Sequence, residues 1–214
     1  MTQPRFERSE PVRRDLLAGP VLDVAPRLLG TVLRSSTAAG TVAVRLTEVE
    51  AYDGPDDPGS HAYRGRTQRN AVMFGPPGHL YVYFTYGMHF CMNISAGPDG
   101  RPSAILLRAG EIVEGIELAR SRRGTTVAHR DLARGPARMC VALGIDRAAN
   151  GADLLAPSER LQLLEGSGFD GVAETGPRVG LREAADRPWR FWIGGDPTVS
   201  PYRPHVPKRR PSAT

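Results

Sequence analysis

Alternating apolar and polar side chains in the first half of the chain predict β-strands, because successive side chains of a strand point to opposite faces. Residues 31–36 (TVLRSS) and 41–52 (TVAVRLTEVEAY) predict a strand pair joined by the Ala-Ala-Gly turn at 38–40. Residues 80–93 (LYVYFTYGMHFCMN) predict a hairpin. Further strands are predicted at SAILLRA (103–109), RLQLLEG (160–166), RVGL (178–181) and WRFWIGG (189–195).

Helices are predicted in three places. Residues 15–30 offer short helical pieces, interrupted by Pro20 and Pro26. EIVEGIELARSRR at 111–123 places apolar residues between charges, and GPARMCVALGI at 135–145 has a proline near its start, so each predicts a helix.

The order of these elements predicts one α+β domain over residues 13–203. Residues 1–12 are expected to be loosely ordered, and residues 204–214 form a basic tail. Residues 53–79 form a long polar loop rich in Gly, Pro and Arg, and loops of this length in compact domains are typically functional or disordered.

The strand at 41–52 changes character along one face. Strict alternation places Val42, Val44 and Leu46 together, and the same parity then continues to Glu48 and Glu50. In one interpretation the strand leaves the core near Leu46 and both glutamates lie in solvent. In the other, one glutamate lines a cleft, where partial burial raises its pKa and lets it act as a general base.

Parity also divides the aromatic hairpin. The even-numbered residues form the better core face, and we assign Leu80, Val82, Phe84 and Phe90 to the core. If residues 86–88 form a three-residue tip, parity is kept across the turn. Tyr83, Cys91 and Asn93 then share the opposite face, Tyr86 projects from the tip, and Gly87 marks the turn.

Composition narrows the chemistry. The 214 residues carry a net charge of +5, and Lys208 is the only lysine, so an internal Schiff base is close to excluded and arginine is left for phosphate contacts. No apolar stretch approaches the ~20 residues of a membrane span, and the N-terminus lacks a secretory signal. Cys91 and Cys140 are too few for a disulfide framework, which indicates a cytoplasmic protein.

A metallohydrolase would need a cluster of ligands. The candidates His61, His79, His89 and Cys91 do not have the spacing of a zinc site, and no metal is expected. A nucleic-acid-binding module without catalysis remains an alternative, because a basic surface with an aromatic tip suits binding alone.

The segment EVEAYDGPDDPGSHAYRGRTQRNAVMFGPPGHLYVYFTYGMHFCMN at 48–93 resembles the signature region of the alkyladenine (3-methyladenine) DNA glycosylase family, of the type shared by mammals and many bacteria. LLRA at 106–109, GPARMCVALGI, RVG and RFWI continue the likeness, which runs from about residue 14 to 200. The resemblance implies a single α+β domain with a curved antiparallel sheet. It also implies a monomer without cofactor that removes damaged purines from duplex DNA.

The resemblance also implies residue roles. Glu50 falls at the position of the general base that activates water, and Arg108 at that of an arginine that helps hold the water. Tyr52, His61 and Tyr83 match the side chains that sandwich the flipped base, and Asn93 matches an asparagine at its edge. Tyr86 matches the wedge that enters the duplex. Regions of DNA contact contain Arg66, Thr67, Arg69, Asn70, Met88, Arg138 and His89, the last standing where tyrosine is common.

Overall fold

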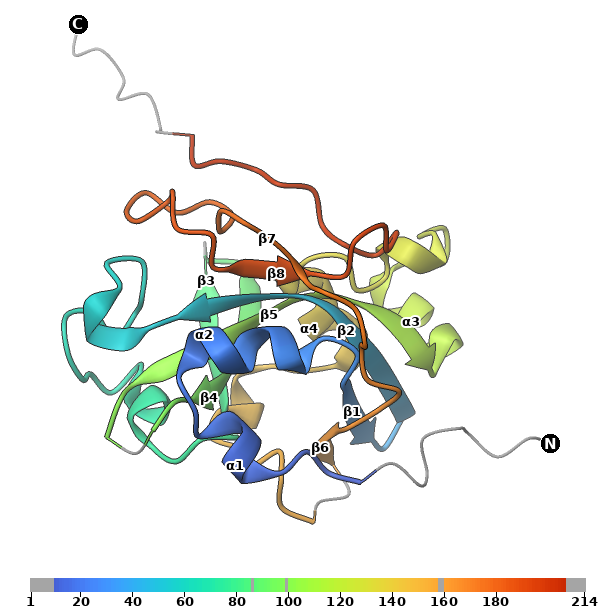
Figure 1. Cartoon of the computed structure of the whole chain (residues 1–214). Helices are drawn as coiled ribbons and strands as arrows, with labels where there is room; N and C mark the ends of the chain where they lie inside the picture. Colours follow the sequence, from blue (N-terminus) through green and yellow to red (C-terminus); the bar gives the residue numbers. More distant parts are fainter. Residues whose placement is uncertain (1–9, 86, 99, 158–159, 207–214) are drawn as a thin grey trace, which may run out of the picture.

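Two long antiparallel strands form the centre of the protein. In the computed structural model, which describes residues 10–85, 87–98, 100–157 and 160–206, β2 (Gly40–Tyr52) pairs with β5 (Ser103–Glu114) along most of its length (Figure 1). β1 (Val32–Thr37) pairs with β2 up to the register Thr37↔Gly40, which confirms the predicted strand pair.

The other strands extend the sheet on both sides. The order is β3-β4-β5-β2-β1-β6, β8 adds to β2 and β7 to β8, and every pairing is antiparallel. The bounds are β3 (Leu80–Thr85), β4 (His89–Ala96), β6 (Leu161–Leu164), β7 (Glu174–Gly176) and β8 (Arg190–Trp192). The predicted α+β class with an antiparallel sheet is confirmed.

The helices are short. α1 (Arg14–Leu17), α2 (Val21–Val24) and η1 (Ala25–Leu28) follow one another, as Pro20 and Pro26 predict. The others are η2 (Gly54–Asp56), η3 (Ala71–Phe74), α3 (Ile116–Arg123), η4 (His129–Asp131), α4 (Pro136–Leu143) and η5 (Arg147–Ala149). In the described ranges no helix has the length and apolar character needed to cross a membrane.

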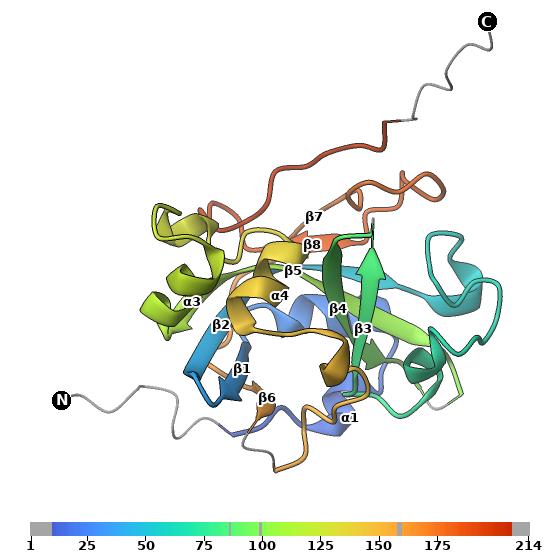
Figure 2. The ribbon, with the colours of Figure 1, turned by 180° about the vertical axis from the view of Figure 1, so that it is seen from behind.

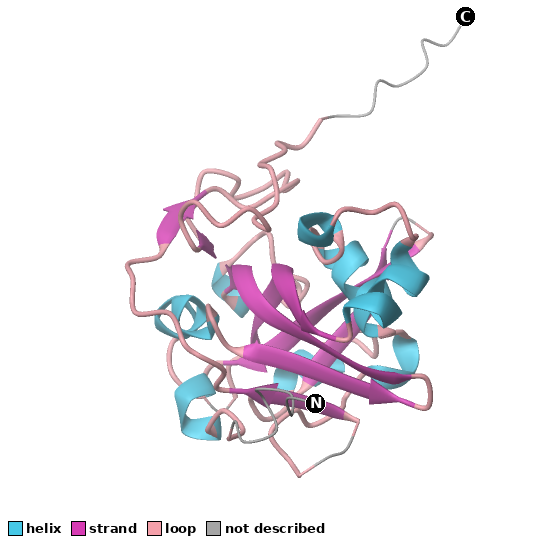
Figure 3. Cartoon of the chain, turned by 90° about the vertical axis from the view of Figure 1, so that its right-hand side faces the viewer, coloured by secondary structure: helices cyan, strands magenta, loops and turns pink. Residues whose placement is uncertain are grey.

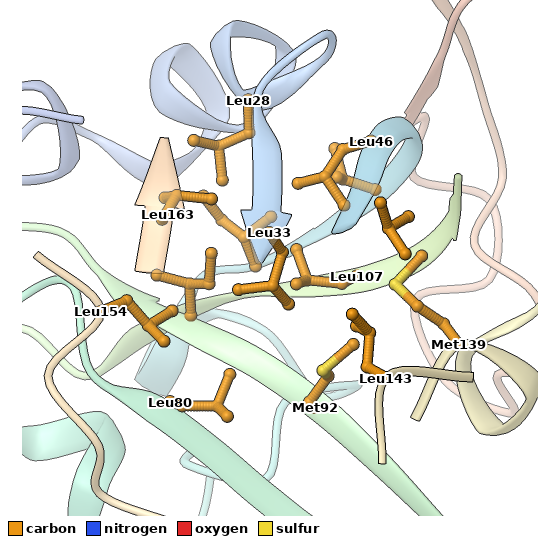
Figure 4. Close-up of a cluster of buried hydrophobic side chains, with 14 of the residues drawn as sticks. Leu28, Leu33, Leu46, Leu80, Met92, Leu107, Met139, Leu143, Leu154 and Leu163 are labelled. Carbon is orange, nitrogen blue, oxygen red and sulfur yellow. The ribbon is translucent and has the colours of Figure 1, made fainter. Parts of the chain in front are cut away.

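The main core lies between the sheet and helices from distant parts of the chain. α2 is in front in Figure 1 and α4 is in front in Figure 2, and Figure 3 shows helices on both sides of the twisted strands. Leu33 of β1 and Leu107 of β5 meet Leu28 of η1 and Leu143 of α4 (Figure 4). Each is fully buried, which stabilises the fold by about 1.5–3 kcal/mol per leucine side chain.

A β-bulge at Thr47 reverses the faces of β2. The even-numbered residues of 42–46 face the main core, as alternation predicts, but the odd-numbered residues of 49–51 do so after the bulge. Glu48 and Glu50 therefore lie opposite the aliphatic side chains, not beside them as unbroken alternation predicts. Both are fully buried, so the interpretation that places them in solvent is wrong.

The predicted helix at 111–123 is wrong in its first part. β5 continues to Glu114, and Ile112 and Val113 belong to different apolar clusters on the two faces of the sheet. Gly115 then turns the chain with φ +73°, and a Cβ there would lie 2.0 Å from the carbonyl oxygen of Thr41. The helix begins only at Ile116. RVGL at 178–181 is likewise not a strand.

The hairpin follows the predicted register. Tyr83 pairs with Cys91 and Thr85 with His89, so residues 86–88 connect the strands and parity is kept. Leu80 and Val82 are buried and Phe90 packs on the core, but Phe84 is 39% exposed, so its assignment to the core is wrong. Phe84 lies near the end of β3, which is an edge strand of the sheet.

Order at the N-terminal end begins before residue 13. The backbone N–H of Val12 donates to Leu163 O, and Glu165 N–H donates to Glu10 O, so this segment lies along β6. Val12 is buried in the main core. At the other end residues 204–206 are exposed, and residues 207–214, which contain most of the basic tail, lie outside the described residues.

Candidate active site

A pocket of about 360 Å³ opens on the face of the hairpin that carries the odd-numbered side chains. Six parts of the chain line it: the end of β2, the loop at 53–79, the hairpin, β5, the start of α4 and the segment at 179–181. The predicted base-pocket residues all contribute to its wall, namely Tyr52, His61, Tyr83 and Asn93. The structure thus brings these four side chains together at one pocket, and their contact with a base stays a prediction.

Glu50 lies fully buried beside this pocket. Its Oε1 accepts a hydrogen bond from the backbone N–H of Val179 at 2.7 Å, and its Oε2 accepts one from the Tyr52 hydroxyl at 2.8 Å. Nη1 of Arg108 lies 3.4 Å from Oε1. These donors stabilise the carboxylate while leaving it next to the pocket, which is the arrangement that a general base requires.

Glu48 has a different environment. Its Oε1 accepts hydrogen bonds from Arg108 Nε at 2.8 Å, Arg190 Nε at 2.7 Å and Ser200 Oγ at 2.9 Å, and its Oε2 accepts one from Ser200 N at 2.6 Å. Arg190 also donates to Ser200 O at 2.7 Å. Because two arginine side chains and both the hydroxyl and the backbone N–H of Ser200 bind it, Glu48 is a structural anchor that joins β2, β5, β8 and the C-terminal segment.

Arg108 connects the two carboxylates. It is only 7% exposed, and its Nη2 donates to Ser200 Oγ at 3.2 Å. Burial alone would lower the pKa of Arg108, but the negative charges of Glu50 and Glu48 outweigh it and raise the pKa above its usual value. Arg108 therefore stays charged and fixed, with Nη1 directed at Glu50.

Aromatic rings form the walls of the pocket. The Tyr52 ring packs against the guanidinium of Arg178, whose Cζ lies 4.6 Å from the ring centroid. The edge of His61 meets Tyr83 at a centroid distance of 4.6 Å. Burial raises the pKa of Tyr52 and of Tyr83 well above the usual value, so both phenols stay neutral and Tyr52 can donate to Glu50.

His61 is held from behind by Tyr81. Its Nδ1 and the Tyr81 hydroxyl are hydrogen-bonded at 3.0 Å, and Tyr81 stacks on Tyr83 at 5.5 Å. Desolvation and the nearby charge of Arg69 lower the pKa of His61 to about 4. The imidazole is therefore neutral near pH 7 and adds no positive charge to the pocket.

Asn93 is buried in the pocket wall, and its Nδ2 donates only a long hydrogen bond to Tyr81 O at 3.4 Å. Its amide is thus weakly held and faces the cavity. Cys91 is also buried there, and burial raises the pKa of its thiol. A protonated thiol at this position acts as a small apolar wall residue.

Arg178 is a functional residue that sequence reasoning missed. It is 1% exposed, its Nη2 donates to Asp57 Oδ1 at 2.7 Å and its Nη1 donates to Ala51 O at 3.0 Å. It packs on the Tyr52 ring and fixes the segment that supplies the Val179 N–H. The RVG motif contained the signal, but Asp57, its partner, lies far away in sequence.

The predicted DNA-contacting residues are placed differently from one another. Most are exposed: Arg66, Thr67, Arg69, His89, Arg138 and Met88, the last 66% exposed. Asn70 is instead buried, with its side chain bound to Thr67 N, His61 O and Gly65 O, so it shapes the loop. Tyr86 lies outside the described residues. No set of three or more potential metal ligands occurs within the described part of the chain.

Comparison with known proteins identifies the family. Residues 15–197 match the methylpurine-DNA glycosylase family. A relative from Streptomyces avermitilis is 60% identical over 203 residues, which is 94% of this chain and 95% of the relative. Relatives from Leifsonia xyli and Nocardia farcinica are 55% and 54% identical over 90% and 84% of this chain, and over 92% and 85% of their own lengths. All three are named "Putative 3-methyladenine DNA glycosylase". The chain belongs to the methylpurine-DNA glycosylase family and is, as a member, a DNA N-glycosylase.

Proposed function

We propose that this DNA glycosylase removes alkylated or deaminated purines from duplex DNA: 3-methyladenine, 7-methylguanine, hypoxanthine and ethenoadenine. It hydrolyses the N-glycosidic bond and so initiates base excision repair. The observation that carries the proposal is the fully buried Glu50 carboxylate, held by Val179 N–H, Tyr52 and Arg108 beside an aromatic pocket.

Glu50 acts as the general base. It takes a proton from a water molecule whose oxygen attacks the anomeric carbon, while the C–N bond breaks and its electron pair leaves with the base. The sugar becomes oxocarbenium-like in the transition state, and the carboxylate also stabilises that charge. Arg108 holds the water near Glu50, because its Nη1 already lies 3.4 Å from Oε1. A base with a cationic alkylated ring leaves as a neutral molecule.

Recognition of the base follows from the walls. The rings of Tyr52 and Tyr83 attract a cationic purine by about 0.5–2 kcal/mol through cation–π contact. A neutral His61 does not oppose that charge. Asn93 faces the cavity, where the exocyclic amino group of guanine leaves its amide clashing or unpaired. Normal guanine has a neutral ring and gains no cation–π attraction against this penalty, whereas the cationic ring of 7-methylguanine does. Neutral lesions depend more on protonation or edge hydrogen bonds.

The base must leave the duplex to reach this pocket, and unstacking it costs a few kcal/mol. Tyr86 at the hairpin tip is proposed to fill the gap, with stacking worth about 1–3 kcal/mol. The neighbouring Met88, 66% exposed, supports a tip that enters DNA, since an exposed apolar side chain there gains burial on binding.

The test is release of free base in single-turnover assays on duplexes that carry hypoxanthine, ethenoadenine or an N3-methylpurine. The wild-type protein is expected to excise at least one of them. Glu50→Gln is expected to bind the same duplexes and release none. If the wild type binds duplex DNA but excises none of the three lesions, the alternative of a non-catalytic nucleic-acid-binding module replaces this proposal.

A further inference from the structure

A second cavity, of about 280 Å³, lies directly beside the base pocket. The two cavities share part of their walls, including Arg108, Cys91 and Val179. The second cavity extends away from the aromatic rings, toward the start of α4 and the C-terminal segment. We call it the arginine cavity, because its wall includes Arg108, Arg134, Arg138 and Arg203, with His89 at one side.

The charge of the arginine cavity is one-sided, since no aspartate or glutamate belongs to its described wall. Arg108 is neutralised by Glu48 and Glu50. Arg134 donates from Nε to Val199 O at 2.8 Å, and its Nη1 lies 3.3 Å from Asp131. Within the described ranges no carboxylate pairs with Arg138 or Arg203. Two guanidinium groups are thus available to an anion.

Arg138 makes only one long hydrogen bond with its guanidinium among the described residues, from Nη1 to Arg134 O at 3.4 Å. Arg203 O accepts a hydrogen bond from Gly180 N at 3.0 Å, next to the Val179 that holds Glu50. Figure 2 shows the C-terminal segment crossing above α4, the helix that carries Arg138. Both side chains are exposed, so charge placed here was not desolvated on folding and is free to bind a ligand.

The position of the cavity identifies its ligand. A nucleotide whose base lies between Tyr52 and Tyr83 must place its anomeric carbon near Glu50 and Arg108, and its backbone must then leave the pocket past Arg108. We propose that the arginine cavity holds one of the two phosphodiesters that flank the flipped nucleotide. Arg138 and Arg203 donate to its oxygens, since the planar guanidinium fork matches phosphate geometry. This proposal rests on the proposed function.

The experiment neutralises the phosphate and the arginines separately. Binding is measured for a protein that carries Glu50→Gln, on a duplex with one hypoxanthine, in which each phosphate around the lesion is replaced in turn by an uncharged methylphosphonate. Arg203→Gln and Arg138→Gln are introduced singly and together, Arg203→Lys restores charge, and Arg27→Gln is the control. Arg27 is an exposed arginine of η1 that lines neither cavity.

Neutralising one flanking phosphate is expected to weaken binding about tenfold for the unmodified arginines, as for a charge-assisted hydrogen bond. The same replacement should have almost no effect once Arg138 and Arg203 are both Gln. Arg203→Lys should restore most of the loss, and Arg27→Gln should behave like the parent. If the fold-losses in affinity from the methylphosphonate and from the arginine substitutions multiply at both flanking positions, as independent effects do, the assignment is overturned.

These outcomes are independent of excision. A wild-type protein that releases no base removes the proposed function, but binding with and without the methylphosphonate still decides which phosphate the arginines contact. The converse outcome is normal excision by the wild type, together with fold-losses in affinity from the methylphosphonate and from the arginine substitutions that multiply. That result leaves the proposed function intact and rules out the arginine cavity as a phosphate site.

Discussion

Glu48 and Glu50 lie two residues apart on β2 and are both fully buried, yet their partners give them different roles. Glu48 accepts hydrogen bonds from two arginines and from Ser200, so its carboxylate stabilises the fold. Glu50 keeps its carboxylate beside the pocket, with a neutral Tyr52 and one backbone N–H as its short hydrogen bonds. A buried carboxylate is thus structural or reactive according to its neighbours.

This contrast predicts the effects of two identical changes. Glu48→Gln leaves Arg190 and Arg108 without a shared buried anion and should lower the free energy of unfolding by about 3–5 kcal/mol. Glu50→Gln should slow excision by at least about 10²-fold with a smaller loss of stability, because Arg108 keeps Glu48. Urea unfolding measures the free energy of unfolding of both variants, and single-turnover assays measure their excision rates. Equal destabilisation by both changes would contradict the assignment.

His61 predicts a pH effect with a definite sign. Its pKa in the folded protein is about 4, below the usual value, so the folded ring stays neutral where the unfolded ring takes up a proton. The contribution to stability is complete above about pH 6.5 and is lost as the pH falls toward 4. NMR titration of the His61 ring, assigned with His61→Gln, should show no protonation between pH 7 and 5. A midpoint near 6.5 would refute this environment.

The hairpin β3–β4 is the element in which core and site meet. Its alternation divides the strands into a core face, with Leu80 and Met92, and a pocket face, with Tyr83 and Asn93. The connection at 86–88 preserves that division across the turn. Gly87 makes the connection with φ +69°, in the left-handed region that favours glycine, and no heavy atom would lie within 4 Å of a Cβ there.

Substitutions at two glycines distinguish the cost of backbone strain from an effect on excision. Gly87→Ala and Gly100→Ala both place Ala in the left-handed region with open space around it, at φ +69° and +78°, so each should destabilise by about 1–2 kcal/mol. Only Gly87→Ala should also slow excision of a stably paired lesion, because it disturbs the proposed wedge. Melting temperatures and single-turnover rates on paired and mismatched hypoxanthine test this. Equal rates for both variants would remove the tip from the flipping step.

On the scale of the whole molecule, part of the exposed positive charge lies near the pocket. Arg66 and Arg69 lie on the loop beside it, and Arg138 and Arg203 line the arginine cavity. The chain as a whole carries +5, with a single lysine, Lys208. Arginine–phosphate contacts release counterions from DNA, so affinity for duplex DNA should depend strongly on salt.

The logarithm of the binding constant should therefore fall linearly with the logarithm of salt concentration. Arg66→Gln should reduce the magnitude of that slope by about 1, as loss of one phosphate contact does. Arg27→Gln removes the same charge from η1 and should leave the slope unchanged. Fluorescence anisotropy on an undamaged duplex measures both. An affinity that does not change with salt would rule out phosphate contacts as its main source.

The chain by itself determined what consecutive residues decide. Alternation located the strand pair at 32–52 and separated the two faces of the hairpin, and the resemblance pointed to four residues that line one pocket. Pro20 located the break between α1 and α2, and Pro26 lies at the start of η1, where the α-helix gives way to a 3-10 turn. These properties follow from covalent geometry and local conformation, which sequence spacing reports directly.

Only the tertiary structure decided the faces and the partners. The bulge at Thr47 arises from pairing with β5 and puts both glutamates on the pocket side of the strand. Unbroken alternation would instead have placed them on the same face as the aliphatic residues. Glu50 is held by Val179, 129 residues later, and Glu48 by Ser200, 152 residues later. A chain reveals which carboxylates it has, but burial and donors from distant segments decide which one becomes a base.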